Sequence, residues 1–94
     1  MNTKDILSAV AEHKQPGRRA VALAYYVQHY GARVREGAAA FSADYGPDPA
    51  TVTGDYVSDL VAELTEYVSV LSVLLVALDT ARAELDAASF PAGA

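Results

Sequence analysis

The sequence predicts an all-α protein: a short N-terminal helix and a long antiparallel helical hairpin that dimerises into a four-helix-type bundle. Apolar residues recur at intervals of three and four along the chain, which is the period of a helix. No stretch alternates apolar and polar β-branched residues, and no Asn-Gly or Asp-Gly hairpin turn is present. A chain of 94 residues is long enough for one helical domain, which we expect over residues 1–94.

The first helix is expected over about residues 4–14. Thr3 is expected to cap it, and Ile6, Leu7 and Val10 follow at helical spacing. Pro16 ends this helix because a proline cannot donate a hydrogen bond to the preceding turn. The same residue suits the first position of the next helix, where a missing N–H costs nothing.

The second helix is expected over about residues 16–44. One face is apolar from Ala20 to Phe41, and the opposite face is mostly polar. Gly46 is expected to end the helix as a left-handed C-cap. Gly31 and Gly37 weaken its middle, and either close approach by a neighbouring helix or a slight bend would explain them.

The third helix is expected over about residues 49–88, and residues 89–94 are expected to form a frayed tail. Asp48 ahead of Pro49 is the main start signal, and Thr53 is a rival N-cap about four residues later. A 3.5-residue apolar repeat, typical of helices that pack at shallow angles, runs along this helix. Its leucines are spaced by sevens: Leu64, Leu71, Leu78 and Leu85.

The middle of the third helix is apolar almost all round, and such a helix is buried all round. The two other helices cover only part of it. A second copy of the chain is the economical cover for the rest, because two-fold dimers are the commonest assembly. The predicted oligomer interface comprises Leu64, Tyr67, Val70, Leu71, Val73, Leu74, Val76 and Leu78. The heptad leucines are flanked by valines of this interface on one side and by a second apolar group on the other. The second group comprises Val57, Val61, Val68 and Leu75.

The formal net charge of −5 argues against general binding to nucleic acid or to an anionic membrane. Residues 1–36 hold six basic residues against three acidic ones, whereas residues 37–94 hold one against nine. We interpret this split as two segments that neutralise each other across an antiparallel seam; a basic binding face is the alternative. The longest apolar run covers about a dozen residues and has acidic neighbours, so no membrane span is predicted.

The N-terminal residues lack the order of basic, apolar and small residues that a signal peptide needs, so the cytoplasm is the expected compartment. The absence of cysteine excludes a disulfide framework, a thiolate zinc site and a cysteine nucleophile. Arginine outnumbers lysine and alanine is abundant, which favours a GC-rich genome such as that of an actinobacterium or one of its phages.

The sequence predicts neither an enzyme nor a metal or cofactor site. His13 and His29 stand outside any His-Glu-x-x-His pattern, and Glu63 and Glu66 lack the histidine that a carboxylate-bridged metal site uses. The serines lack a strand-to-helix elbow, and the glycines form no loop that would cradle a phosphate. An enzyme is therefore only the runner-up class.

A basic and aromatic face of the second helix is the candidate recognition surface. Arginine and tyrosine are enriched among residues that dominate binding at interfaces, although these tyrosines could also be edges of the core with their phenols in water. The predicted partner-binding residues are Arg18, Arg19, Tyr25, Tyr26, His29 and Arg33. The leading hypothesis is a homo-oligomeric, non-enzymatic interaction or regulatory module that binds an unidentified protein through this face.

Two alternative functions use the same residues. The first helix, the turn at Gln15 to Gly17 and the arginines after it form the pattern of a helix-turn-helix DNA-binding regulator. Two helices joined near residue 46 also resemble the helical-hairpin proteins exported by type VII secretion. In that family the turn carries Trp-Xaa-Gly, but Tyr45 precedes Gly46 here and the chain has no tryptophan. The family's Tyr with an acid four residues later is missing as well, because Tyr56 leads to Leu60.

Overall fold

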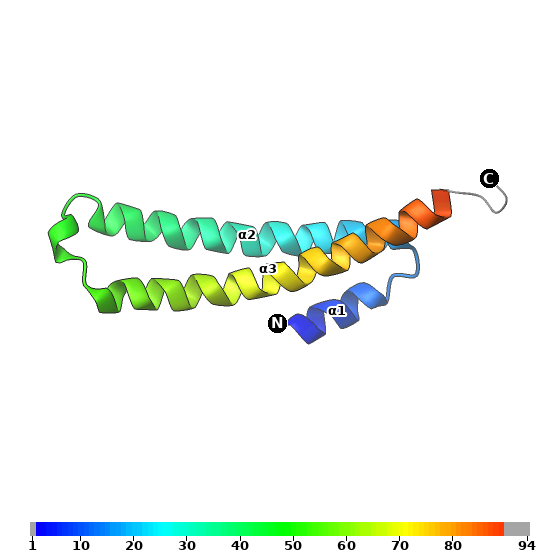
Figure 1. Ribbon diagram of the computed structural model, residues 1–94, viewed down its shortest axis with the longest axis horizontal. Coiled ribbons are helices and arrows are strands. Elements are labelled where there is room, and N and C mark those ends of the chain that lie inside the picture. The colour runs from blue at the N-terminus through cyan, green and yellow to red at the C-terminus, as the bar shows by residue number, and fades with distance from the viewer. Residues whose placement is uncertain (1, 90–94) are drawn as a thin grey trace.

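The computed structural model describes residues 2–89 as three α-helices and one short 3-10 helix. They are α1 (Thr3–Ala11), α2 (Pro16–Tyr45), η1 (Pro49–Thr51) and α3 (Gly54–Ser89). None of these residues forms a strand, so the predicted all-α class is confirmed. As Figure 1 shows, α2 and α3 lie side by side and run in opposite directions, and the molecule measures 66 × 26 × 17 Å.

Helix α1 begins one residue earlier and ends three residues earlier than expected. Asn2, not Thr3, is its N-cap, with the side-chain oxygen accepting a hydrogen bond from the N–H of Asp5 at 2.9 Å. At the other end, the N–H groups of Glu12 and His13 reach back only three residues, so the last turn tightens and stops. The chain then becomes extended at the residue before Pro16, as that proline requires.

Helix α2 begins at Pro16 as expected, but the prediction of a left-handed cap at its end is wrong. Gly46 has φ −57° and ψ −43°, which is right-handed, and its N–H donates to the carbonyl oxygen of Ser42 at 2.8 Å. A Cβ added at Gly46 would lie 2.5 Å from that same oxygen. Glycine is therefore suited to this position by its lack of a side chain and not by a positive φ.

Helix α3 begins at Gly54, five residues after the expected start at residue 49. Pro49–Thr51 forms a separate 3-10 turn, because Val52 is extended and interrupts the helical path. The rival cap is the one used: the hydroxyl of Thr53 accepts a hydrogen bond from the N–H of Tyr56 at 3.3 Å. The expected tail began at residue 89, but Ser89 still belongs to α3, and residues 90–94 lie outside the described part of the chain.

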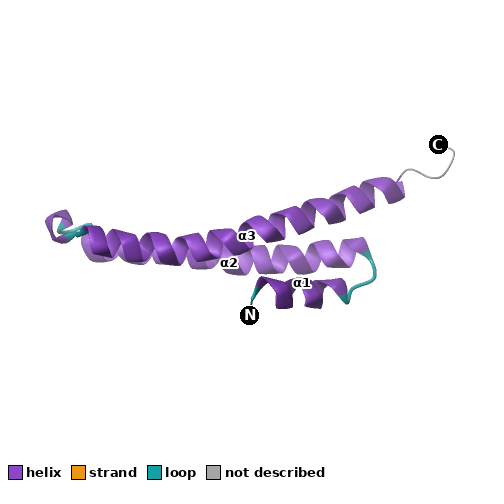
Figure 2. Ribbon diagram, turned by 60° about the horizontal axis from the view of Figure 1, so that its bottom comes forward, coloured by secondary structure: helices purple, strands orange, loops and turns teal. Residues whose placement is uncertain are grey.

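The core is the junction of the three helices. Ile6 and Val10 of α1 pack with Leu23 of α2 and Leu74 of α3, all fully or almost fully buried. Figure 2 shows why this core is local: α1 lies beside the half of the α2–α3 pair that is remote from the connecting loop. Two packed helices alone enclose little volume. Side chains become fully buried here because α1 packs against both α2 and α3.

In the half of the α2–α3 pair nearer the loop, the two helices are joined by aromatic contacts and by one close approach at a glycine. A Cβ added at Gly37 would lie 3.1 Å from the side chain of Leu64, so this glycine lets α3 come close to α2. Further along, the ring centroids of Phe41 and Tyr45 are 4.7 Å apart, and Tyr45 stacks on Tyr56 at 5.4 Å. Close approach by a neighbouring helix therefore accounts for Gly37.

Candidate protein interaction surfaces

The polar and charged side chains of the described residues lie on the surface or are only partly buried. Every buried side chain in residues 2–88 is hydrophobic. In the described part of the chain, no group of three or more His, Cys, Asp or Glu residues is placed to hold a metal ion. Exposed side chains and the hollows between them are therefore the candidate sites of recognition.

Arg19, one of the predicted partner-binding residues, is engaged within the chain. Its guanidinium donates to the carbonyl oxygens of His13 at 2.9 Å and Lys14 at 3.0 Å, and it forms an ion pair with Glu84 of α3. The arginine thus ties the connection after α1 to both long helices. A charge-assisted hydrogen bond of this kind is stronger than a neutral one, so Arg19 has a clear structural role.

Replacing Arg19 with alanine is expected to lower the free energy of unfolding by about 1–2 kcal/mol, because two carbonyl oxygens and a carboxylate lose their partner. Arg18→Ala is the matched control, since Arg18 is exposed and its removal is expected to change stability by less than about 0.5 kcal/mol. Urea unfolding followed by circular dichroism measures both. Equal effects of the two substitutions would contradict the structural role of Arg19.

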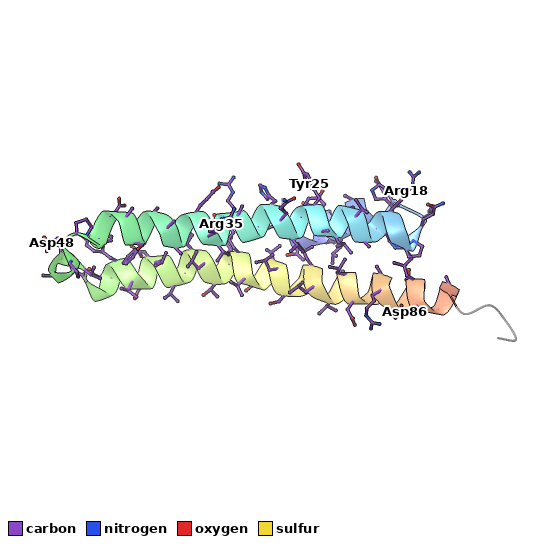
Figure 3. The ribbon with its side chains drawn as sticks, turned by 90° about the horizontal axis from the view of Figure 1, so that it is seen from above. Arg18, Tyr25, Arg35, Asp48 and Asp86 are labelled. Atoms are coloured by element: carbon purple, nitrogen blue, oxygen red, sulfur yellow. The ribbon has the colours of Figure 1, made fainter. Side chains whose placement is uncertain are left out.

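The other predicted partner-binding residues are spread over α2. Arg18 and Tyr25 point away from α3, as Figure 3 shows, and both are exposed. Tyr26 is half-buried, packs against the core and meets Tyr25 edge to face with ring centroids 6.1 Å apart. His29 and Arg33 are also exposed but lie further along the helix, outside the hollow that Arg18, Tyr25 and Tyr26 share.

That hollow, which we name the α2 depression, has a volume of about 680 Å³. Val21 and Tyr25 in it are 72% and 70% exposed, although both are large and apolar or aromatic. Sequence reasoning missed Val21; its place four residues before Tyr25, on the same face of a helix, was the available signal. The residues that line the depression are His13, Gln15, Gly17, Arg18, Val21, Ala22, Tyr25 and Tyr26.

The chain itself covers much of the predicted oligomer interface on α3. Leu74 is completely buried among the three helices, and Val70 and Leu78 pack against the same core. Three more of these residues are half-buried, namely Leu64, Tyr67 and Leu71. Only Val73 and Val76 remain exposed. Within one chain, α2 and α1 together therefore cover most of this predicted interface.

A different apolar stripe on α3 remains exposed. We name it the outer seam, and its residues are Val57, Val61, Val68 and Leu75. Val61, Val68 and Leu75 are 57%, 47% and 53% exposed. They alternate at spacings of three and four with half-buried leucines, namely Leu64, Leu71 and Leu78. This is a second heptad seam on the same helix, and it shares its leucines with the seam that faces α2.

The outer seam lies on the side of α3 away from α1. Val70 and Ala77 pack against the core beside α1. Val68 and Leu75 each precede one of these residues by two positions, which is about 200° around a helix of 3.6 residues per turn. Helix α1 therefore cannot cover both sides, and the outer seam has no cover from the described residues.

Helix α3 is also the one helix in residues 2–89 that is long and apolar enough to cross a membrane by length and composition. The core helix of a globular protein can pass the same test, but only 6% of the most apolar stretch of α3 is buried in the chain.

No family model matches the chain, and comparison with curated proteins and with solved structures finds no match.

Proposed function

We propose that this protein is a non-enzymatic interaction module. It self-associates through the outer seam as a helical hairpin, forming a bundle, and binds another protein through the α2 depression. The observation that carries the proposal is the outer seam, whose apolar side chains extend over ~27 Å of helix from Val57 to Leu75. Contiguous exposed apolar surface on a folded chain marks a site of interaction.

The occupant of the outer seam is better explained as protein than as lipid. Helix α2 runs beside α3, and halfway along it the exposed side chains of Arg33, Arg35 and Glu36 are charged. A bilayer that accepted α3 together with α2 would have to accept these charges near its centre, which costs about 3 kcal/mol or more for each. A protein partner can cover the outer seam and leave the charged face of α2 in water.

Self-association is tested by light scattering on the purified chain. A mass of twice 9.9 kDa at micromolar concentration supports it, and a monomeric mass at every accessible concentration contradicts it. Flotation with vesicles is the companion measurement. Stable binding to neutral vesicles would contradict the choice of protein over lipid.

The α2 depression has the composition of a binding hot spot. It combines an exposed tyrosine and valine with the guanidinium of Arg18, in a chain that is acidic overall. Aromatic and arginine side chains give large contact areas at the centre of interfaces. A partner that suits this surface presents an apolar side chain flanked by carboxylates.

The double substitution Val21→Ala and Tyr25→Ala is expected to abolish capture of the partner from a native lysate, because it removes the two most exposed apolar side chains of the α2 depression. Gln28→Ala, at an exposed position outside the depression, is the control and is expected to capture as the wild type does. Identical captured proteins for all three chains would contradict the assignment of this surface. The mass of the chain is a separate readout, so this result leaves the self-association test unaffected.

The helix-turn-helix alternative has less support from the geometry. A recognition helix needs free arginines at its start, but Arg19 is occupied by two carbonyl oxygens and by Glu84. Binding to DNA at low salt would revive this alternative, because even non-specific contacts are strong under that condition.

A further inference from the structure

We infer that the outer seam is covered by the α2 helix of a second copy of this chain, with the two-fold axis parallel to the long axis of the molecule. The inference rests on the proposed self-association and adds the surface of the second copy that docks and the direction in which it runs. Three observations carry it: an unexplained glycine, the matching levels of two columns of residues, and the charges of the two helices.

The first observation is Gly31. A Cβ added at this position would meet nothing within 4 Å, whereas the same test at Gly37 finds Leu64 at 3.1 Å. A glycine inside a helix costs about 1 kcal/mol relative to alanine, and the described chain offers no packing reason for it. Close approach by a helix from outside the chain gives it one.

Gly31 belongs to a column of small residues on the same side of the molecule as the outer seam. Ala22 packs against the core that contains Ile6 and Val10 of α1, and Ala24 follows it by two positions, or about 200° around the helix. Ala24 therefore faces away from α1, as Val68 does on α3. The column repeats every seven residues and consists of Ala24, Gly31 and Ala38.

The second observation is that the column of small residues on α2 and the outer seam on α3 have matching positions along the long axis of the molecule. Three sets of neighbours align α2 and α3 along the long axis: Leu23 and Leu74 share the buried core, the ring centroids of Tyr30 and Tyr67 are 6.3 Å apart, and Gly37 lies against Leu64. These neighbours place each small residue within one helical turn, measured along the long axis, of one large residue. The matching residues are Ala24 and Leu75, Gly31 and Val68, and Ala38 and Val61.

Rotation about a two-fold axis parallel to the long axis of the molecule does not change the position of any residue along that axis. Turning a second copy about such an axis therefore places the small column of one chain against the large residues of the other. Each α3 then has an antiparallel neighbour on both sides, its own α2 and that of the second copy, as in an up-down four-helix bundle. The half-buried leucines that the two seams share complete their burial in the same step.

The third observation is charge. Helix α2 carries four arginines against two acidic residues, and α3 carries one arginine against seven. The arrangement places each acidic α3 between two basic α2 helices. A two-fold axis across the rod would instead place α3 on α3 and bring like charges together, which disfavours that arrangement.

Gly31→Leu is the sharpest test. The single chain has open space at this position and leucine is a better helix former than glycine, so the variant is expected to fold, with helicity equal to or above wild type. The second copy can no longer approach, and light scattering is expected to show a monomer at concentrations where the wild type is a dimer. Ala40→Leu is the control, because it adds the same side chain nine residues later, about half a turn around the helix, and is expected to stay dimeric.

The results separate this inference from the proposed function. A dimeric wild type with a dimeric Gly31→Leu variant overturns the arrangement and leaves self-association standing. A monomeric wild type overturns both. Cross-linking gives an independent answer, because the chain has no cysteine of its own.

An equal mixture of Ala24→Cys chains and Leu75→Cys chains, treated with a short bis-maleimide, is expected to yield a covalent dimer that contains one chain of each kind. Predominant self-cross-linking of Leu75→Cys would place α3 against α3 and overturn the arrangement. Failure to form the mixed dimer would overturn it as well.

Discussion

The substitution Val68→Glu is expected to convert the proposed dimer into monomers. Val68 is 47% exposed in the single chain, so a glutamate there keeps its hydration and the fold is retained. In the dimer the carboxylate would be buried against an apolar neighbour, at a cost of about 3 kcal/mol or more per chain. Because the dimer contains two such carboxylates and each 1.4 kcal/mol corresponds to a factor of ten, dimerisation is expected to weaken by roughly ten-thousandfold.

Sedimentation over a range of concentrations measures this effect. Val21→Glu is the control: Val21 is even more exposed, but it lies in the α2 depression and away from the outer seam. The control is expected to remain dimeric. If the dissociation constants of Val68→Glu and of the wild type are the same, the outer seam is not buried in the dimer.

The substitution Leu74→Ala is expected to have the largest effect on folding. Leu74 is completely buried at the junction of α1, α2 and α3, and the cavity left by alanine costs about 2–5 kcal/mol. Because the free energy of unfolding of a small domain is low, a large part of the population is expected to unfold or to release α1.

The adjacent residue provides the contrast. Leu75 is 53% exposed, and at concentrations low enough to keep the chain monomeric, Leu75→Ala is expected to cost less than about 1 kcal/mol. Urea unfolding at low and high protein concentration measures both substitutions. Equal losses at low concentration would contradict the assignment of Leu74 to the inside and Leu75 to the outside.

The period of the apolar residues was sufficient to predict the helices, because it follows directly from 3.6 residues per turn. The start of α3 was predicted at the stronger local signal, Asp48 before Pro49, whereas the helix begins after the rival cap, Thr53. The extended backbone of Val52, which selects Thr53, depends on the whole connection. In the same way, nothing in the local sequence distinguished a left-handed Gly46 from the right-handed one observed.

The surfaces were predictable in kind but not in detail. An apolar girth larger than the chain can cover was evident from the valines and leucines of the third helix. Which side stays open depends on where α1 docks, and that docking is a tertiary event: it covers Val70 and leaves Val68 exposed. The arginines were likewise equivalent in the sequence, until the turn of the chain brought two carbonyl oxygens within reach of Arg19 and none to Arg18.

The one-sided position of α1 has a consequence for cooperativity. All five buried hydrophobic residues of the described chain lie in or near α1, and the half of the molecule nearer the loop holds none of them. Local opening free energies follow the density of buried contacts, so the rod consists of two unequal folding units. The unit under α1 resists opening, whereas the unit towards the loop opens more readily and gains most when another helix packs on it. In the proposed dimer, association would therefore complete the folding of the half of the molecule nearer the loop.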